Sequence, residues 1–157
     1  MGYLNLVVLE SLRVMSPVPH ATVNTLSRDA QIGKYQVRAG DVLQINISGL
    51  HKNPAEWQRP KEFIPERFDS SSPLSLTPAG TKRKTMSFCP FYGGKRVCFG
   101  KTFAEANLKI MATYLSQYFE MEFVEKDKYP DTHNLPMAQI GQSENPPIPV
   151  KLSARPF

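Results

Sequence analysis

The sequence predicts a mainly α-helical chain that carries small β-sheets. Residues 3–15 are rich in Leu and Val and contain no Gly or Pro, and residues 101–119 place apolar side chains at helical spacing. Residues 21–47 change to short apolar runs separated by turn residues, which is typical of short strands. Residues 53–100 show little periodicity, so we expect a long irregular segment between the helices.

The helix predicted over residues 3–15 ends at the Ser-Pro-Val-Pro sequence that follows it, because proline cannot continue the backbone hydrogen bonds. Within residues 21–47, one face of the predicted sheet is expected to be buried. Its alternating apolar residues are Leu43, Ile45 and Ile47. A second, shorter helix is expected at residues 48–51.

Residues 101–119 form the clearest predicted helix. Their apolar side chains recur every three or four residues and predict a single apolar stripe. The stripe comprises Ala104, Leu108, Met111, Ala112, Leu115 and Phe119. The tail, residues 120–157, is predicted to hold strands at 121–124 and 148–152, with a polar loop between them.

The composition fits one ordinary globular domain, with 157 residues that are 41% hydrophobic and 21% charged. The net charge of +5 comes from scattered basic residues. Their only dense run, Lys82-Arg83-Lys84, is predicted to be a solvated loop, so we expect no nucleic-acid partner. The two cysteines, Cys89 and Cys98, are too few for a disulfide scaffold and lack zinc-site spacing.

The stretch from residue 88 to residue 100 carries the chemistry. Paired glycines allow a tight turn and a close approach to a flat ligand. Cys98 stands just before the predicted long helix, whose unpaired N–H groups and dipole favour a thiolate. Gly100 leaves the sulfur approachable. By contrast, Cys89 lies between Phe88 and Pro90 and fits a buried, inert cysteine.

Residues 91–100 read Phe-x-x-Gly-x-Arg-x-Cys-x-Gly, which resembles the haem-binding loop of the cytochrome P-450 family. The resemblance implies haem b (iron protoporphyrin IX) as cofactor, with Cys98 as the catalytic thiolate and axial ligand of the iron. It also implies that Arg96 pairs with a haem propionate and that Phe91 shields the sulfur. The implied cofactor-binding residues are Phe91, Gly94, Arg96, Cys98 and Gly100. Tyr92 departs from the family, which usually has a small residue there.

Two further motifs resemble the same family. Glu10 and Arg13 match its Glu-x-x-Arg signature and share one face of the predicted helix. Residues 65–68 read Pro-Glu-Arg-Phe and match a second family segment, whose arginine here is Arg67. The resemblance implies a structural triad of Glu10, Arg13 and Arg67, a buried three-way salt bridge that serves folding and haem retention rather than chemistry.

The resemblance covers nearly the whole chain and implies the C-terminal haem-binding portion of the cytochrome P-450 fold, about the last third of a typical member. Its implied parts are the Glu-x-x-Arg helix (1–15), a small sheet (21–47), the meander and cysteine loop (53–100), the haem-backing helix (101–119) and the terminal strands (120–157). In the family, the oxygen-activating helix and any membrane anchor lie upstream. The form of the motifs implies the microsomal, eukaryotic type, on the cytoplasmic face of the endoplasmic reticulum membrane through an anchor absent from this chain.

The implied activity is a haem-thiolate monooxygenase that inserts oxygen into a lipophilic small molecule. Electrons would come from an NADPH-dependent reductase or another donor at a basic face around Lys95, Lys101 and residues 82–84. Only the segment after His20 and residues 138–142 would reach substrate. Two alternatives stay open: a haem-thiolate isomerase that rearranges peroxides, and an inactive fragment that cannot hold haem alone.

Overall fold

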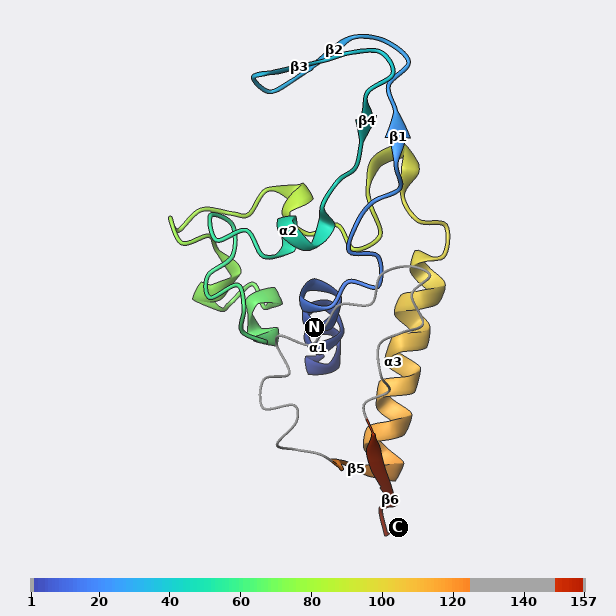
Figure 1. Ribbon diagram of the computed structural model, residues 1–157. Helices are drawn as coiled ribbons and strands as arrows, with labels where there is room; N and C mark the ends of the chain where they lie inside the picture. Colours follow the sequence, from blue (N-terminus) through green and yellow to red (C-terminus); the bar gives the residue numbers. More distant parts are fainter. Residues whose placement is uncertain (1, 125–148, 157) are drawn as a thin grey trace.

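The structure of the chain, a computed structural model, describes residues 2–124 and 149–156. The elements follow one another as labelled in Figure 1. The helices are α1 (Tyr3–Val14), α2 (Ile47–His51) and α3 (Lys101–Tyr118), and the strands are β1 (Asn24–Thr25), β2 (Ala30–Ile32), β3 (Tyr35–Val37), β4 (Val42–Leu43), β5 (Phe119–Phe123) and β6 (Val150–Ala154). Short 3₁₀ turns lie at Pro65–Phe68, Pro73–Ser75, Thr85–Ser87 and Gly94–Arg96.

Helix α1 packs against both the 3₁₀ turn Pro65–Phe68 and helix α3 (Figure 1). Its buried apolar side chains are Leu6, Val8, Leu12 and Val14. Burying a side chain of this size contributes about 1.5–3 kcal/mol to folding. The helix ends at Val14, as expected from the prolines that follow, and the N–H of Met15 closes its last turn on the carbonyl of Ser11.

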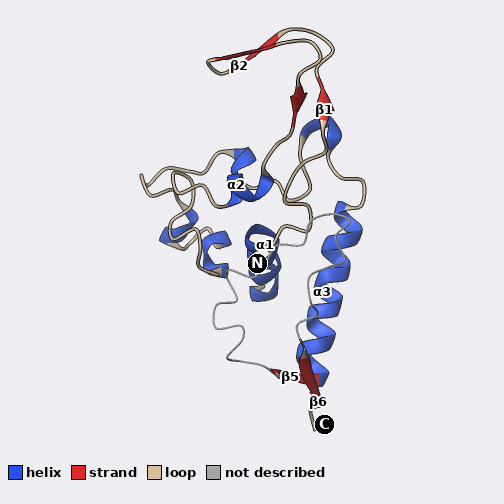
Figure 2. Cartoon of the chain, viewed as in Figure 1, coloured by secondary structure: helices blue, strands red, loops and turns tan. Residues whose placement is uncertain are grey.

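The strands form small antiparallel pairs (Figure 2). β1 pairs with β4, β2 pairs with β3, and β5 pairs with β6 with Phe119 opposite Ala154. The β2–β3 hairpin turns through Gly33, whose φ of 60° suits glycine, and it extends beyond β1 and β4 as an arm.

The described residues form a mixed α/β structure, in which the predicted small sheets are present as two-stranded antiparallel pairs beside the helices. Long irregular segments and paired strands take up much of the chain between the helices (Figure 2). The predicted helices and strands are all present with small shifts at their ends. Ile148 of the last predicted strand, and residues 138–142, which were expected to reach substrate, lie outside the described residues.

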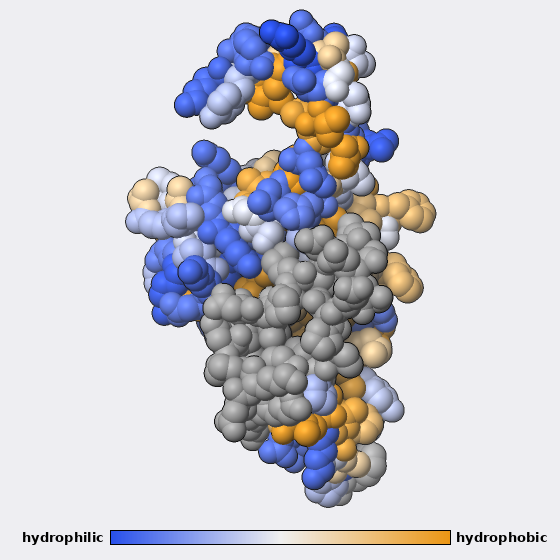
Figure 3. Space-filling view, viewed as in Figure 1, coloured by the Kyte–Doolittle hydropathy of each residue, from blue (hydrophilic) through white to orange (hydrophobic). Residues whose placement is uncertain are grey.

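The predicted buried face of the first sheet is only partly correct. Ile47 is buried, but Ile45 is 52% exposed. The reason is geometric: β4 ends at Leu43 and the chain then turns into α2, so strand alternation no longer applies to both positions. Apolar side chains accordingly reach the surface around β1 and β4, where Figure 3 shows a hydrophobic patch.

Helix α3 has the predicted apolar stripe, yet it contains no buried residue. Leu108 is 41% exposed and Met111 is 51% exposed. Its neighbours within the described structure are chiefly α1 and β5, which cover one part of its surface. An amphipathic pattern therefore identified the helix without identifying what covers its apolar face.

Candidate functional site

The cysteine loop is shaped by its glycines and by backbone hydrogen bonds. Gly94 begins a 3₁₀ turn with a φ of 60°, a left-handed conformation that favours glycine. The turn brings the N–H of Cys98 to the carbonyl of Phe91 at 2.8 Å. Gly100 then caps α3, and its carbonyl accepts from the N–H of Ala104. The loop thus folds back so that Cys98 lies at the N-terminus of α3.

The thiol of Cys98 is free and exposed. A Cβ atom placed on Gly100 would lie 3.9 Å from the Cys98 sulfur, so the glycine leaves room beside the sulfur without a clash. The position before the first turn of α3 exposes the sulfur to the positive end of the helix dipole. These properties are those of a sulfur that can serve as a ligand.

Cys89 has the opposite environment. Its side chain is 4% exposed, and burial raises the pKa of its thiol. Its backbone N–H donates to Nε2 of His51 at 2.9 Å. His51 is fully buried, and burial lowers its pKa to about 4, so the ring is neutral and accepts this bond. The backbone of Cys89, the cysteine predicted to be inert, thus takes part in a hydrogen bond that joins α2 to the cysteine loop.

The predicted cofactor-binding residues lie on this one loop. Phe91 is partly buried, whereas Arg96 is exposed and pairs with no carboxylate of the described residues. Beside the loop lies a cavity of about 570 Å³ lined by Arg96, Tyr92 and Cys89 of the loop and by Ala21, Thr22 and Ile47. Cys98 does not line this cavity.

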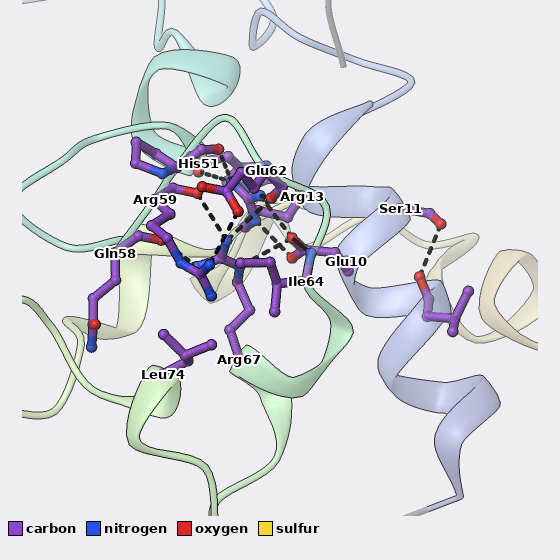
Figure 4. A network of polar contacts seen from close by, with 12 residues as sticks. Glu10, Ser11, Arg13, His51, Gln58, Arg59, Glu62, Ile64, Arg67 and Leu74 are labelled. Atoms are coloured by element: carbon purple, nitrogen blue, oxygen red, sulfur yellow. Dashed lines mark hydrogen bonds and ion pairs between the residues drawn. The ribbon is translucent and has the colours of Figure 1, made fainter. Parts of the chain in front are cut away.

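The structure brings Glu10, Arg13 and Arg67 together (Figure 4). All three side chains are fully buried. Glu10 Oε2 lies 2.7 Å from Arg13 Nε, and Glu10 Oε1 lies 3.0 Å from Arg67 Nε. The same carboxylate accepts from the N–H of Ile64 at 2.8 Å. A single negative charge therefore partners two buried guanidinium groups, one on α1 and one on the turn Pro65–Phe68.

Backbone carbonyls satisfy the remaining guanidinium N–H groups. Arg13 donates to the carbonyls of His51 and Pro60, at 2.9 and 2.8 Å. Arg67 donates to those of Arg59 and Glu62, at 2.9 and 3.1 Å. Figure 4 shows these bonds converging from α1, α2 and the irregular segment. The cluster fastens residues 58–67 to α1, which fixes the segment that leads to the cysteine loop.

Sequence reasoning missed the role of Arg83. The run Lys82-Arg83-Lys84 is predicted to be a solvated loop, and both lysines are exposed, but Arg83 turns inward. Its guanidinium lies 4.3 Å from the ring centroid of Trp57 and donates to the carbonyls of Leu74 and Arg67. No local pattern distinguishes Arg83 from its neighbours. Its partners come from distant segments, so only the fold reveals it.

The residues around Cys98 fit a haem. A flat apolar ring with two carboxylates needs exposed apolar surface, a cation and a ligand close together. Val97 is 49% exposed, Phe103 is 76% exposed and Phe99 is fully exposed, and all lie near the free thiol in sequence. Arg96 supplies the cation from the same loop.

Within the described residues, no helix has the length and apolar character to cross a membrane.

Comparison with known proteins gives the relationship. The cytochrome P-450 family pattern matches residues 1–150. Steroid 17-alpha-hydroxylase/17,20 lyase from Homo sapiens is 32% identical over 131 residues, which are 82% of this chain and 24% of that protein. The 3-hydroxyindolin-2-one monooxygenase of Zea mays is 33% identical over 123 residues, which are 78% of this chain and 22% of that protein. The chain thus spans about a quarter of the length of these curated relatives.

Solved structures agree. The retinoic acid-bound cyanobacterial CYP120A1 superposes with a TM-score of 0.77 and 29% identity, covering 98% of this chain and 32% of that one. The cytochrome P-450DA heme domain superposes with a TM-score of 0.65 and 30% identity, covering 78% and 26%. With sequence and backbone matched over most of its length, this chain belongs to the cytochrome P-450 family.

Proposed function

We propose that this chain is the C-terminal, haem-binding portion of a haem-thiolate monooxygenase, with Cys98 as the axial ligand of the iron. The complete protein would insert oxygen into a lipophilic substrate with electrons from a reductase. The observation that carries the proposal is the free, exposed thiol of Cys98 at the N-terminus of α3, in a glycine-shaped loop that also presents Arg96.

The family supports the reaction class. Cytochromes P-450 are generally haem-dependent monooxygenases that draw electrons from reductase partners. The two curated relatives bear the names of a hydroxylase and lyase and of a monooxygenase. Both are full-length proteins about four times longer than the matched region, so the substrate of this protein is left to experiment.

Each residue of the cysteine loop has a proposed role toward the haem. Cys98 would bind the iron through its thiolate, and Arg96 would hold a propionate through charge-assisted hydrogen bonds. Phe91 would shield the sulfur from water, while Gly94 and Gly100 keep side chains away from the ring and the sulfur. The bound haem would supply oxygen activation, and a thiolate ligand favours cleavage of the oxygen–oxygen bond.

Glu10, Arg13 and Arg67 would act in folding and haem retention. Their side chains are fully buried and fully engaged with one another and with backbone groups, so none is available to substrate. The geometry supports a role in positioning: the cluster joins α1 to the segment that precedes the cysteine loop.

The electron donor would dock near the cysteine loop. Lys95 and Lys101 flank Cys98 and are both exposed, and a basic surface steers an acidic partner toward it. Lys84 is a weaker candidate because its ammonium lies 3.7 Å from Glu56. We also propose a location on the cytoplasmic face of the endoplasmic reticulum membrane, which the resemblance to microsomal members supports.

An inactive, isolated portion is the second candidate, and the exposure of α3 favours it for the chain taken alone. Apolar side chains along α3 and the cysteine loop remain in contact with water in the described structure. Haem bound only on this side would keep one face open to solvent, so stable retention would need further protein on the opposite face.

The proposed function is tested by the reduced carbon monoxide difference spectrum of the protein expressed from its complete gene. The wild type should give a Soret band shifted far to the red, and Cys98→Ser should lose it. Cys89→Ser is the matched control, because that cysteine is buried in the same loop, and it should keep the band. Haem-containing wild type without the shifted band would rule out thiolate ligation.

A further inference from the structure

Tyr92 occupies an unfavourable backbone conformation. Its φ of 63° lies in the left-handed region, which a residue with a bulky side chain rarely adopts. The structure must therefore hold Tyr92 there through other contacts, and such outliers cluster at functional sites.

Two sets of contacts hold it. The ring packs against the buried cluster of Ala21, Ile47 and Cys89. The hydroxyl oxygen accepts a hydrogen bond from the N–H of Thr22 at 2.6 Å. This bond joins the cysteine loop to the segment before β1, 70 residues away in the sequence. Tyr92 is thus held in place between the cysteine loop and the segment before β1.

The hydroxyl group of Tyr92 retains one unused hydrogen. A phenol both accepts and donates, and the Thr22 bond uses only its acceptor capacity. Its own O–H has no acceptor among the described residues. Asn24 also lines the cavity, where its side-chain N–H donates to the carbonyl of Thr22 at 2.8 Å, and within the described residues no hydrogen bond joins Asn24 to Tyr92. Tyr92 therefore presents a donor, held in place, to whatever occupies the cavity.

Arg96 lines the same cavity of about 570 Å³ and finds no carboxylate within the described part of the chain. A guanidinium and a phenol O–H that share one cavity and lack acceptors form a donor pair, and a carboxylate is the group that accepts from both. Apolar side chains make up much of the remaining lining, including Ile45, Ile47 and Leu50. The ligand should therefore be an apolar molecule that carries a carboxylate.

We propose that Tyr92 is a carboxylate-binding residue whose O–H donates to the same carboxylate that Arg96 binds in this cavity. The inference rests on the proposed function, because haem b carries propionates and is one source of such a group. A carboxylate on a bound small molecule is the other source. In both cases the bond between Thr22 and Tyr92 positions the hydroxyl.

The test uses the haem-loaded protein expressed from its complete gene. Tyr92→Phe removes the O–H and keeps the ring, and haem loss is followed by transfer to excess apomyoglobin. Haem dissociation should accelerate on the order of ten-fold, as expected when one hydrogen bond to a charged group is lost. Tyr114→Phe, which removes an exposed hydroxyl from α3, is the matched control and should change nothing.

Haem dimethyl ester separates binding from support of the fold, because its esters cannot accept as carboxylates do. After reconstitution with haem dimethyl ester, wild type and Tyr92→Phe should lose the haem ester at equal rates. An equal acceleration of both haem forms would mean that Tyr92 only clamps Thr22, and it would overturn the proposal. If Tyr92→Phe does not change the rate at which native haem is lost, dodecanoate is titrated into both proteins. Its binding is then followed by the shift of the Soret band.

Weaker dodecanoate binding in Tyr92→Phe would assign the carboxylate to a small-molecule ligand and uphold the proposal. Unchanged affinity together with unchanged haem loss would overturn it. Failure of the proposed function looks different, since the wild type would then show no thiolate-ligated haem before any variant is compared.

Discussion

Replacing Glu10 by Gln should destabilise the protein strongly, although the two side chains have nearly the same shape. Glu10 carries the negative charge that partners Arg13 and Arg67, and all three side chains are fully buried. The substitution removes that charge and directs amide N–H groups toward guanidinium donors. Two cations are then left buried without a counter-charge.

The expected loss in the free energy of unfolding follows from the contacts that Glu10→Gln removes and from those that it leaves in place. Breaking a buried ion pair by neutralising one partner costs about 3–5 kcal/mol. Carbonyl partners of Arg13 and Arg67 remain, which places the expected cost toward the lower end of that range. With a denaturant slope of about 2–3 kcal/mol per molar urea, the unfolding midpoint should fall by roughly 1–2.5 M.

The chain offers a matched control in Glu62→Gln. Glu62 pairs with Arg59 at 3.2 Å with the same spacing of three residues, but these side chains are 53% and 54% exposed. An exposed pair contributes about 0–1 kcal/mol. Urea unfolding of both variants, followed by circular dichroism, makes the comparison. Equal midpoints for Glu10→Gln and Glu62→Gln would refute the claim that burial makes this cluster a principal support of the fold.

Two further predictions concern residues whose contacts inside the fold the sequence did not predict. His51 is neutral in the folded protein, with a pKa lowered from 6.5 to about 4, so its stabilisation is complete above about pH 6.5 and is lost as the pH falls toward 4. The loss should reach about 3 kcal/mol in urea unfolding, and it should be missing from His51→Gln. Arg83→Lys should cost about 1–3 kcal/mol in the same assay, because it removes the contact with Trp57 and the carbonyl bonds. Lys82→Ala, on the exposed neighbour, should stay within about 0.5 kcal/mol, and equal losses would mean that Arg83 is no more than a surface cation.

Local patterns predicted the helices well. The run of Leu and Val before Pro17 predicted α1, and the apolar spacing after Gly100 predicted α3, because helix propensity and helical spacing are properties of nearby residues. The predicted burial was less accurate. Ile45 is exposed and α3 buries no residue, since burial depends on which segments pack against an element. Spacing along the chain carries no such information.

The three motifs differ in how far the sequence could define them. The order of residues from Phe91 to Gly100 predicted a tight loop that ends at a helix, and the structure has that loop. Glu10 and Arg13 share a helix face through their spacing alone. Arg67 joins them from 54 residues beyond Arg13, and no local rule places it there. The role of Cys98 as an iron ligand stays a prediction for the carbon monoxide spectrum.

The sequence by itself determined which family this protein belongs to, where its helices lie and which cysteine stands at a helix N-terminus, because these depend on residue order and short-range geometry. Only the tertiary structure decided that Arg83 packs on Trp57, that His51 bonds to Cys89, and that Tyr92 reaches Thr22 beside Arg96. Each of these contacts joins segments that are distant in the chain. They form when buried surface and hydrogen bonds together outweigh the entropy of ordering both segments.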